Sequence, residues 1–210
     1  MNSTWIPIIL ILVVTGLCIL LPLSTVIKNQ NKKSHRERVE FAERHGFSVQ
    51  PYDWDTLILN GEYRGYNVTI KDYRLAAPYK RDYAFHITLF IKNPKNIRMR
   101  VAWGANYGRC GNLPLLIGEK DEFYGKMKLC GDPKSFLLDF IYSSLVKRGI
   151  KKAIGRTYKI MGFVTLELEN DQLVFEQFER NLWANNQSYM EYMMDWLIDC
   201  AKKIDEATIS

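Results

Sequence analysis

The chain has 210 residues, of which 47% are hydrophobic and 13% aromatic, and its formal net charge is +6. This composition excludes an intrinsically disordered chain, and no solenoid-type repeat is present. Four cysteines in this length do not make a disulfide framework.

The first element is an apolar run without charged residues at positions 5–27. A helix of this length crosses a hydrocarbon core of about 30 Å and satisfies its own backbone hydrogen bonds in lipid. No basic n-region or A-x-A-like cleavage site accompanies the run, which favours an uncleaved anchor over a signal peptide. We therefore predict a transmembrane helix at residues 5–27, preceded by a short extracytoplasmic N-terminus at residues 1–4.

Basic residues follow this predicted span. The cations of this flank are Lys28, Lys32, Lys33, Arg36 and Arg38. By the positive-inside rule they place the C-terminal side in the cytoplasm. They are also candidate contacts for anionic lipid headgroups, at about 1 kcal/mol per charge. The alternative is that they serve only as topology determinants in a solvated stem.

The rest of the chain predicts a basic juxtamembrane stem at residues 28–45 and one soluble domain at residues 46–210. Apolar spacing predicts, in chain order, a helix at 34–45, strands at 57–59, 66–73, 83–92, 97–103 and 123–129, a helix from 133 to about 145, a hairpin at 161–168 and 173–178, and a helix at 187–204. Asn60-Gly61 and Gly65 predict a turn, and Asp132 and Pro133 suit the N-cap and first position of a helix. This order indicates an α+β fold: a mainly antiparallel sheet with amphipathic helices packed on one face.

Cys110 and Cys130 lie 20 residues apart, and the chain has no CxxC motif. A disulfide between them would require the opposite topology, and the glycosylation sequons at Asn67 and Asn186 are irrelevant on a cytoplasmic face. The three histidines and the cysteines lack the spacing of a zinc site. We therefore predict no metal and no cofactor.

One stretch supports a family resemblance. The string that runs from Leu59 through Gly61, Tyr63 and Gly65 to Val68 follows a helix ending at His45, and Cys130-Gly-Asp-Pro and a hairpin and helix come later. This layout resembles a loose group of uncharacterised prokaryotic membrane proteins with one N-terminal span and one α+β domain. The resemblance implies a location and a fold, and it provides no catalytic residues.

Catalytic motifs such as GxSxG, HExxH and Walker A are absent from the sequence. The glycine-rich loop at 104–111 lacks the Gly-Lys-Ser/Thr ending of a phosphate loop. Cys110 as a nucleophile with His86 as its base is a further candidate, but the sequence does not indicate that these two residues meet. The most distinctive charged segment follows an amphipathic helix and includes Lys147, Arg148, Lys151 and Lys152, with Arg156 behind them.

This segment is a second candidate contact for anionic lipid, and its alternative is a solvated helix end. Nucleic-acid binding is disfavoured because no aromatic platform or helix-turn-helix accompanies the charges. The sequence therefore predicts a single-pass membrane protein whose cytoplasmic domain binds or scaffolds a protein partner at the lipid bilayer without catalysis. The alternative is a membrane-tethered enzyme with a site near the 104–125 loops.

Overall fold

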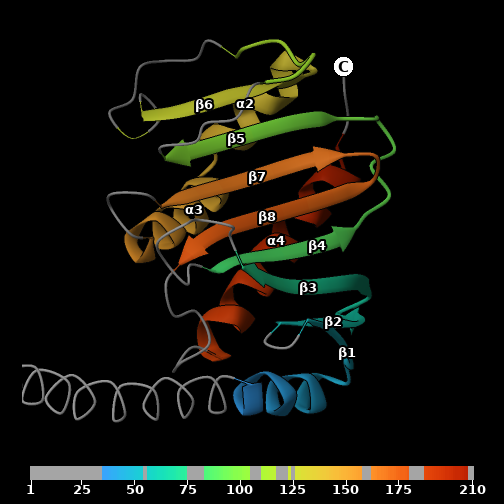
Figure 1. Cartoon of the computed structure of the whole chain (residues 1–210). Helices are drawn as coiled ribbons and strands as arrows, with labels where there is room; N and C mark the ends of the chain where they lie inside the picture. The colour runs from blue at the N-terminus through green and yellow to red at the C-terminus, as the bar shows by residue number, and fades with distance from the viewer. Residues whose placement is uncertain are drawn as a thin grey trace, which may run out of the picture.

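In the computed structural model the described residues are 35–53, 56–74, 83–104, 110–116, 123, 126–157, 162–179 and 187–207. They form an eight-stranded sheet with helices packed on one face (Figure 1). The predicted α+β class with an antiparallel sheet is confirmed. No helix among the described residues is long and apolar enough to cross a membrane, and the span predicted at 5–27 lies outside them.

The elements in chain order are a helix at 35–45 (here the stem helix), β1 Ser48–Asp53, β2 Thr56–Tyr63, β3 Tyr66–Arg74, β4 Tyr83–Phe90, β5 Arg98–Gly104, β6 Met127–Asp132, α2 Lys134–Tyr142, α3 Ser144–Arg156, β7 Phe163–Glu169, β8 Gln172–Glu179 and α4 Gln187–Asp205. The sheet order is β1-β2-β3-β4-β8-β7-β5-β6, and neighbouring strands are antiparallel. Three further strands, β5, β6 and β7, lie between β4 and β8 in the sequence although these two strands are neighbours in the sheet.

The strand register separates an apolar face from a polar face. One row across the sheet is buried throughout and consists of Leu59, Ile70, Ile87, Phe175, Leu166 and Val101. The next row along the strands points to the other face and consists of Asn60, Thr69, Thr88, Val174, Glu167 and Arg100. Since side chains alternate along a strand, the helices cover the apolar face and leave the polar face opposite to them.

The stem helix belongs to the same hydrophobic core as the sheet. Phe41 and Ala42 are fully buried in that core. On its polar side, His45 Nε2 lies 3.1 Å from Glu191 Oε1 of α4. The Gln187 side chain at the start of α4 donates a hydrogen bond to the Glu37 carbonyl, at 3.3 Å. The stem helix is therefore fixed to the N-terminal end of α4.

Two local predictions were wrong. Asn60-Gly61 lies inside β2, and the turn is at Arg64-Gly65. Gly61 is needed for a close approach, because a Cβ there would meet the Phe47 ring at 2.2 Å. Asp132 ends β6 and gives no side-chain cap to α2.

The bounds of the helix predicted from 133 to about 145 were also wrong. The observed helix, α2, ends at Tyr142, and α3 begins directly afterwards with Ser143 as its N-cap. The Ser143 hydroxyl accepts a hydrogen bond from the Val146 N–H at 3.4 Å. A serine satisfies a free N–H at the first turn of a helix, so this residue both ends α2 and starts α3.

Helices α3 and α4 meet at a glycine. A Cβ at Gly149 would lie 2.0 Å from the ring of Trp196, which is almost fully buried. The indole ring of Trp196 also packs edge-on against Phe175 of β8, with the ring centroids 5.7 Å apart. Trp196 therefore contacts both α3 and the sheet from its position on α4.

We predict that Gly149→Ala destabilises the fold by about 1–3 kcal/mol, since the methyl group has no space against Trp196. Gly155→Ala in the same helix is the matched control. A Cβ at Gly155 meets no atom within 4 Å, so this change should stabilise by roughly 0.5–1 kcal/mol through helix propensity. Denaturant unfolding of the full chain, followed by tryptophan fluorescence, measures both. Equal stability of the two variants would contradict the close packing of α3 on Trp196.

Candidate functional site: a basic groove on helix α3

Helix α3 has two chemically distinct faces. Its buried face consists of small or apolar residues: Val146, Gly149, Ile150 and Ala153. Its outer face follows the spacing i, i+3, i+4, i+7 and i+8 and consists of Ser144, Lys147, Arg148, Lys151 and Lys152. The helix contains no Asp or Glu, so all charges on its outer face are positive.

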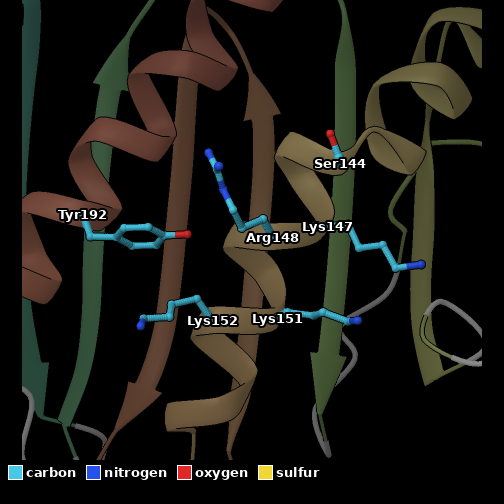
Figure 2. A pocket seen from close by; sticks show the side chains of 6 residues that line it. All are labelled: Ser144, Lys147, Arg148, Lys151, Lys152 and Tyr192. Carbon is cyan, nitrogen blue, oxygen red and sulfur yellow. The ribbon is translucent and has the colours of Figure 1, made fainter.

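These residues line a groove with a cavity volume of about 600 Å³, to which α4 contributes Tyr192. Figure 2 shows Arg148 and Lys152 extending from α3 toward α4, and Lys147 and Lys151 extending to the other side. The structure therefore brings together the four cations that the sequence singled out in this segment.

Aromatic rings hold the lysine side chains of the groove. The Nζ atoms of Lys147 and Lys151 lie 5.6 and 5.4 Å from the centroid of the Phe123 ring. Lys152 Nζ lies 5.7 Å from the centroid of the Tyr192 ring. A cation over an aromatic face gains about 0.5–1 kcal/mol at an exposed site without losing its charge, so these contacts leave the positive potential of the groove in place.

Buried and partly buried hydrogen bonds fix the orientation of α3. Trp196 Nε1 donates to the Leu145 carbonyl at 3.0 Å near the start of the helix. Gln177 of β8 donates to the Ala153 carbonyl near its end, at 3.2 Å, and accepts from the Tyr189 hydroxyl at 2.6 Å. Because both ends are attached to α4 or to the sheet, the cationic face of α3 is held toward solvent.

The cations predicted near the membrane stem have different surroundings. Lys28, Lys32 and Lys33 lie outside the described residues. Arg36 is exposed and forms an ion pair with Glu40 of the same helix, at 3.4 Å. Arg38 is only 4% exposed, so it does not belong to the cations that a headgroup could reach.

The polar face of the sheet holds a second group of ionisable side chains. Glu176 of β8 lies between His86 of β4 and Thr165 of β7 in the strand register. Burial raises the pKa of the Glu176 carboxyl above its ordinary value. Burial, and secondarily the charge of Lys71, lowers the pKa of His86. His86 Nε2 also lies 3.0 Å from Thr88 Oγ1.

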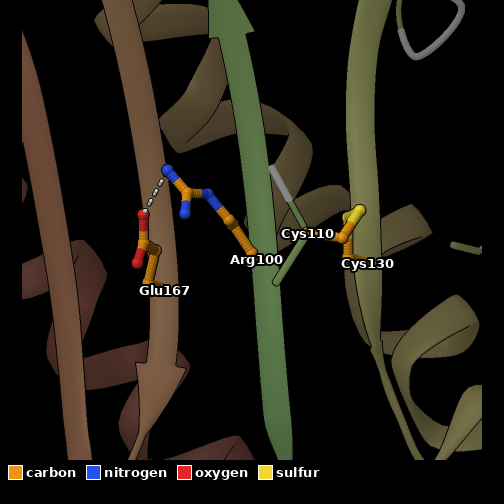
Figure 3. Close-up of a disulfide and its surroundings, with 4 residues drawn as sticks. All are labelled: Arg100, Cys110, Cys130 and Glu167. Atoms are coloured by element: carbon orange, nitrogen blue, oxygen red, sulfur yellow. Dashed lines mark ion pairs between the residues drawn. A yellow bond between two sulfur atoms is a disulfide. The ribbon is translucent and has the colours of Figure 1, made fainter. Parts of the chain in front are cut away.

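The same face continues to a disulfide. Arg100 of β5 forms an ion pair with Glu167 of β7, at 3.3 Å. Burial raises the pKa of Glu167, and the charge of Arg100 opposes this shift. Arg100 is paired in register with Cys130 of β6, which is bonded to Cys110 (Figure 3). The pairing that the sequence left as the alternative is thus present in the structure.

No His, Cys, Asp or Glu side chains among the described residues gather into a group that could hold a metal ion. Most of the loop region that the enzyme alternative placed at 104–125 lies outside the described residues, at 105–109, 117–122 and 124–125. Asn67 of the first sequon is exposed on β3, and Asn186 of the second lies outside the described part.

Sequence reasoning missed the aromatic components of the groove. Phe123 and Tyr192 are far from α3 in sequence, and only the tertiary packing brings their rings to its lysines. The sequence of α4 marks Tyr192 as a large polar residue beside an apolar stripe. It does not indicate that Lys152 of α3 contacts the Tyr192 ring.

We predict that Glu176→Gln raises the melting temperature at about pH 7. A carboxyl whose folded pKa is raised contributes stability below its unfolded pKa, and this stability is lost as the pH rises through the folded pKa. The gain of the variant should therefore shrink toward pH 4. Glu62→Gln, at an exposed position of β2, is the control and should show no gain at pH 7. A lower melting temperature of Glu176→Gln at pH 7 would contradict the unfavourable burial of this carboxylate.

Comparisons with protein-family models, with curated proteins and with solved structures find no match for this chain. The group of membrane proteins that its layout resembles therefore has no support from these comparisons.

Proposed function

We propose that this chain is a membrane-tethered binding domain, and that its basic groove binds the phosphate-bearing headgroups of anionic lipids in the membrane that holds it. The observation that carries this proposal is the gathering of Lys147, Arg148, Lys151 and Lys152 in one groove. Among the described residues, no carboxylate forms an ion pair with Arg148, Lys151 or Lys152. Phosphate oxygens are suitable counter-charges for such a set.

The arrangement of like charges supports an anionic ligand. Lys147 and Lys151 are four residues apart, as are Arg148 and Lys152, so each pair lies on adjacent turns of α3. Like charges at this spacing destabilise a helix by roughly 0.2–0.5 kcal/mol per pair. A bound phosphate group would offset this repulsion, so binding of the anion would stabilise the helix.

The place of the groove also supports a membrane ligand. The stem helix contacts Gln187 and Glu191 of α4, and Tyr192 on the same turns contacts Lys152. The groove therefore lies at the end of α4 where the chain leads back to the predicted span. Only residues 28–34 separate that span from the stem helix, a distance of at most about 24 Å for an extended chain.

An apolar docking surface has less support. The exposed large hydrophobic side chains among the described residues are Val49, Phe90 and Leu115, and they lie on β1, on β4 and in the segment 110–116. Large contiguous apolar patches are the usual mark of a protein-binding surface. The charge of α3 is therefore the stronger indication of what the domain binds.

The test compares the full chain in nanodiscs of neutral phospholipid with the full chain in nanodiscs that also contain an anionic phospholipid. An amine-reactive reagent followed by mass spectrometry reports the accessibility of each lysine. We expect Lys151 and Lys152 to react several-fold less in the anionic discs. Lys202 and Lys203, exposed at the other end of α4, are internal controls and should react equally in both. Equal reactivity of Lys151 and Lys152 in the two discs would contradict the proposal.

A charge-neutralising pair sharpens this test. Arg148→Gln with Lys152→Gln should weaken headgroup binding by about fivefold per charge, because each cation near an anionic surface contributes about 1 kcal/mol. The measurement is the fraction of anionic lipid at which Lys151 is half protected. Lys202→Gln with Lys203→Gln removes the same charge elsewhere and should leave this fraction unchanged. If single-stranded RNA protects Lys151 in neutral discs and anionic lipid does not, the groove binds nucleic acid instead.

A further inference from the structure

The disulfide between Cys110 and Cys130 closes the outer edge of the sheet. The two Cα atoms are 5.7 Å apart, within the usual range for such bonds. Cys130 is fully buried in β6, and Cys110 is half-buried at the start of the segment 110–116. The bond therefore joins an edge strand to the segment beside it.

Backbone hydrogen bonds continue the same closure. The Leu116 N–H donates to the Leu129 carbonyl at 2.8 Å, and the Gly131 N–H donates to the Pro114 carbonyl at 2.9 Å. These bonds occupy groups on the side of β6 that faces away from β5. An uncovered edge strand is prone to pair with other chains, so the disulfide holds in place the segment that prevents this.

The bond has the character of a structural disulfide. Its cysteines are 20 residues apart and do not form the CxxC motif of exchange catalysts. Cys200, the free cysteine of the described residues, is fully buried, and burial raises the pKa of its thiol. A thiol that is buried and protonated does not attack a disulfide, so Cys200 is not positioned to rearrange the bond.

We infer that the domain lies on the extracytoplasmic side of the membrane, where a disulfide of this kind forms and persists. Cytosolic thiols are kept reduced, and structural disulfides are rare there. This orientation is the reverse of the one that the basic flank predicts. The flank lies within the 15–20 residues of the span where basic residues influence orientation, so the disulfide and the flank favour opposite sides, and we give the disulfide precedence. The Cys110–Cys130 disulfide lies within the folded domain, so it reflects the compartment in which this domain itself folds.

The disulfide between Cys110 and Cys130 forms by thiol–disulfide exchange. The Cys110 and Cys130 thiols are oxidised together to one disulfide, and a donor protein disulfide of the compartment is reduced to a dithiol. The exchange passes through a mixed disulfide, transfers two electrons to the donor and leaves the two thiol protons on it. The inference rests on β6 and its edge and does not use the groove, and it implies that the anionic headgroups proposed for the groove are those of the outer leaflet.

The first arm of the test counts thiols of the full chain in its own membrane. Cells are quenched with acid, the proteins are denatured, and a large maleimide reagent adds a gel shift for every free thiol. The chain has four cysteines, so the bonded form should show two shifts before reduction and four after it. Cys110→Ser frees Cys130 and should show three shifts with or without reduction. Four shifts in the unreduced wild type would overturn the inference.

The second arm locates the domain. A protease added to right-side-out vesicles of this membrane should remove the described domain from the wild-type chain, while a cytosolic marker protein enclosed in the vesicles stays intact. Protection of the domain in these vesicles, with cleavage only after they are lysed, would overturn the inference even if the disulfide is present. The lysine protection at the groove is measured in discs, so it neither depends on this outcome nor decides it.

Discussion

The contact between Trp196 and Gly149 is the constraint on which the helical layer depends. The indole ring occupies the space that any side chain at Gly149 would need, contacts Phe175 of the sheet, and donates its N–H to the Leu145 carbonyl. One side chain of α4 thus sets the distance of α3 from both α4 and the sheet. An aromatic residue with a single polar atom can do this because its apolar area is buried while its one donor is satisfied.

The groove follows from this constraint. One face of α3 packs against Trp196, and the end of the helix is hydrogen-bonded to Gln177. The cations therefore lie on the outer face of the helix. Four positive charges without an acidic residue in the helix are then concentrated on a rigid surface. Rigid elements present charges in a fixed geometry, which a solvated helix end does not. The same helix accordingly has a packed face against Trp196 and a cationic face on the opposite side.

Sequence patterns predicted the parts of this fold that are determined locally. The closing hairpin and α4 lie within two residues of their expected bounds, because their apolar periods are strong and turn residues separate them. Gly61 was misassigned because its reason is the Phe47 ring, which lies outside the local pattern. The cations of α3 were identified as a charged segment that follows an amphipathic helix, whereas Tyr192 and the strand order could not be predicted, since both depend on contacts between segments distant in the chain.

The pairing of β4 with β8 has a consequence for how the chain folds. These strands are neighbours at the middle of the sheet, yet the whole of β5, β6, α2, α3 and β7 separates them in sequence. Such a contact joins residues far apart in the sequence and forms slowly. The chain loses the entropy of closing a long loop before the two strands form their hydrogen bonds. During synthesis, almost the entire chain must be made before β8 pairs with β4 and α4 covers the apolar face of the first four strands. A chaperone that shields this half-sheet would therefore act from the completion of β4 until α4 has been made.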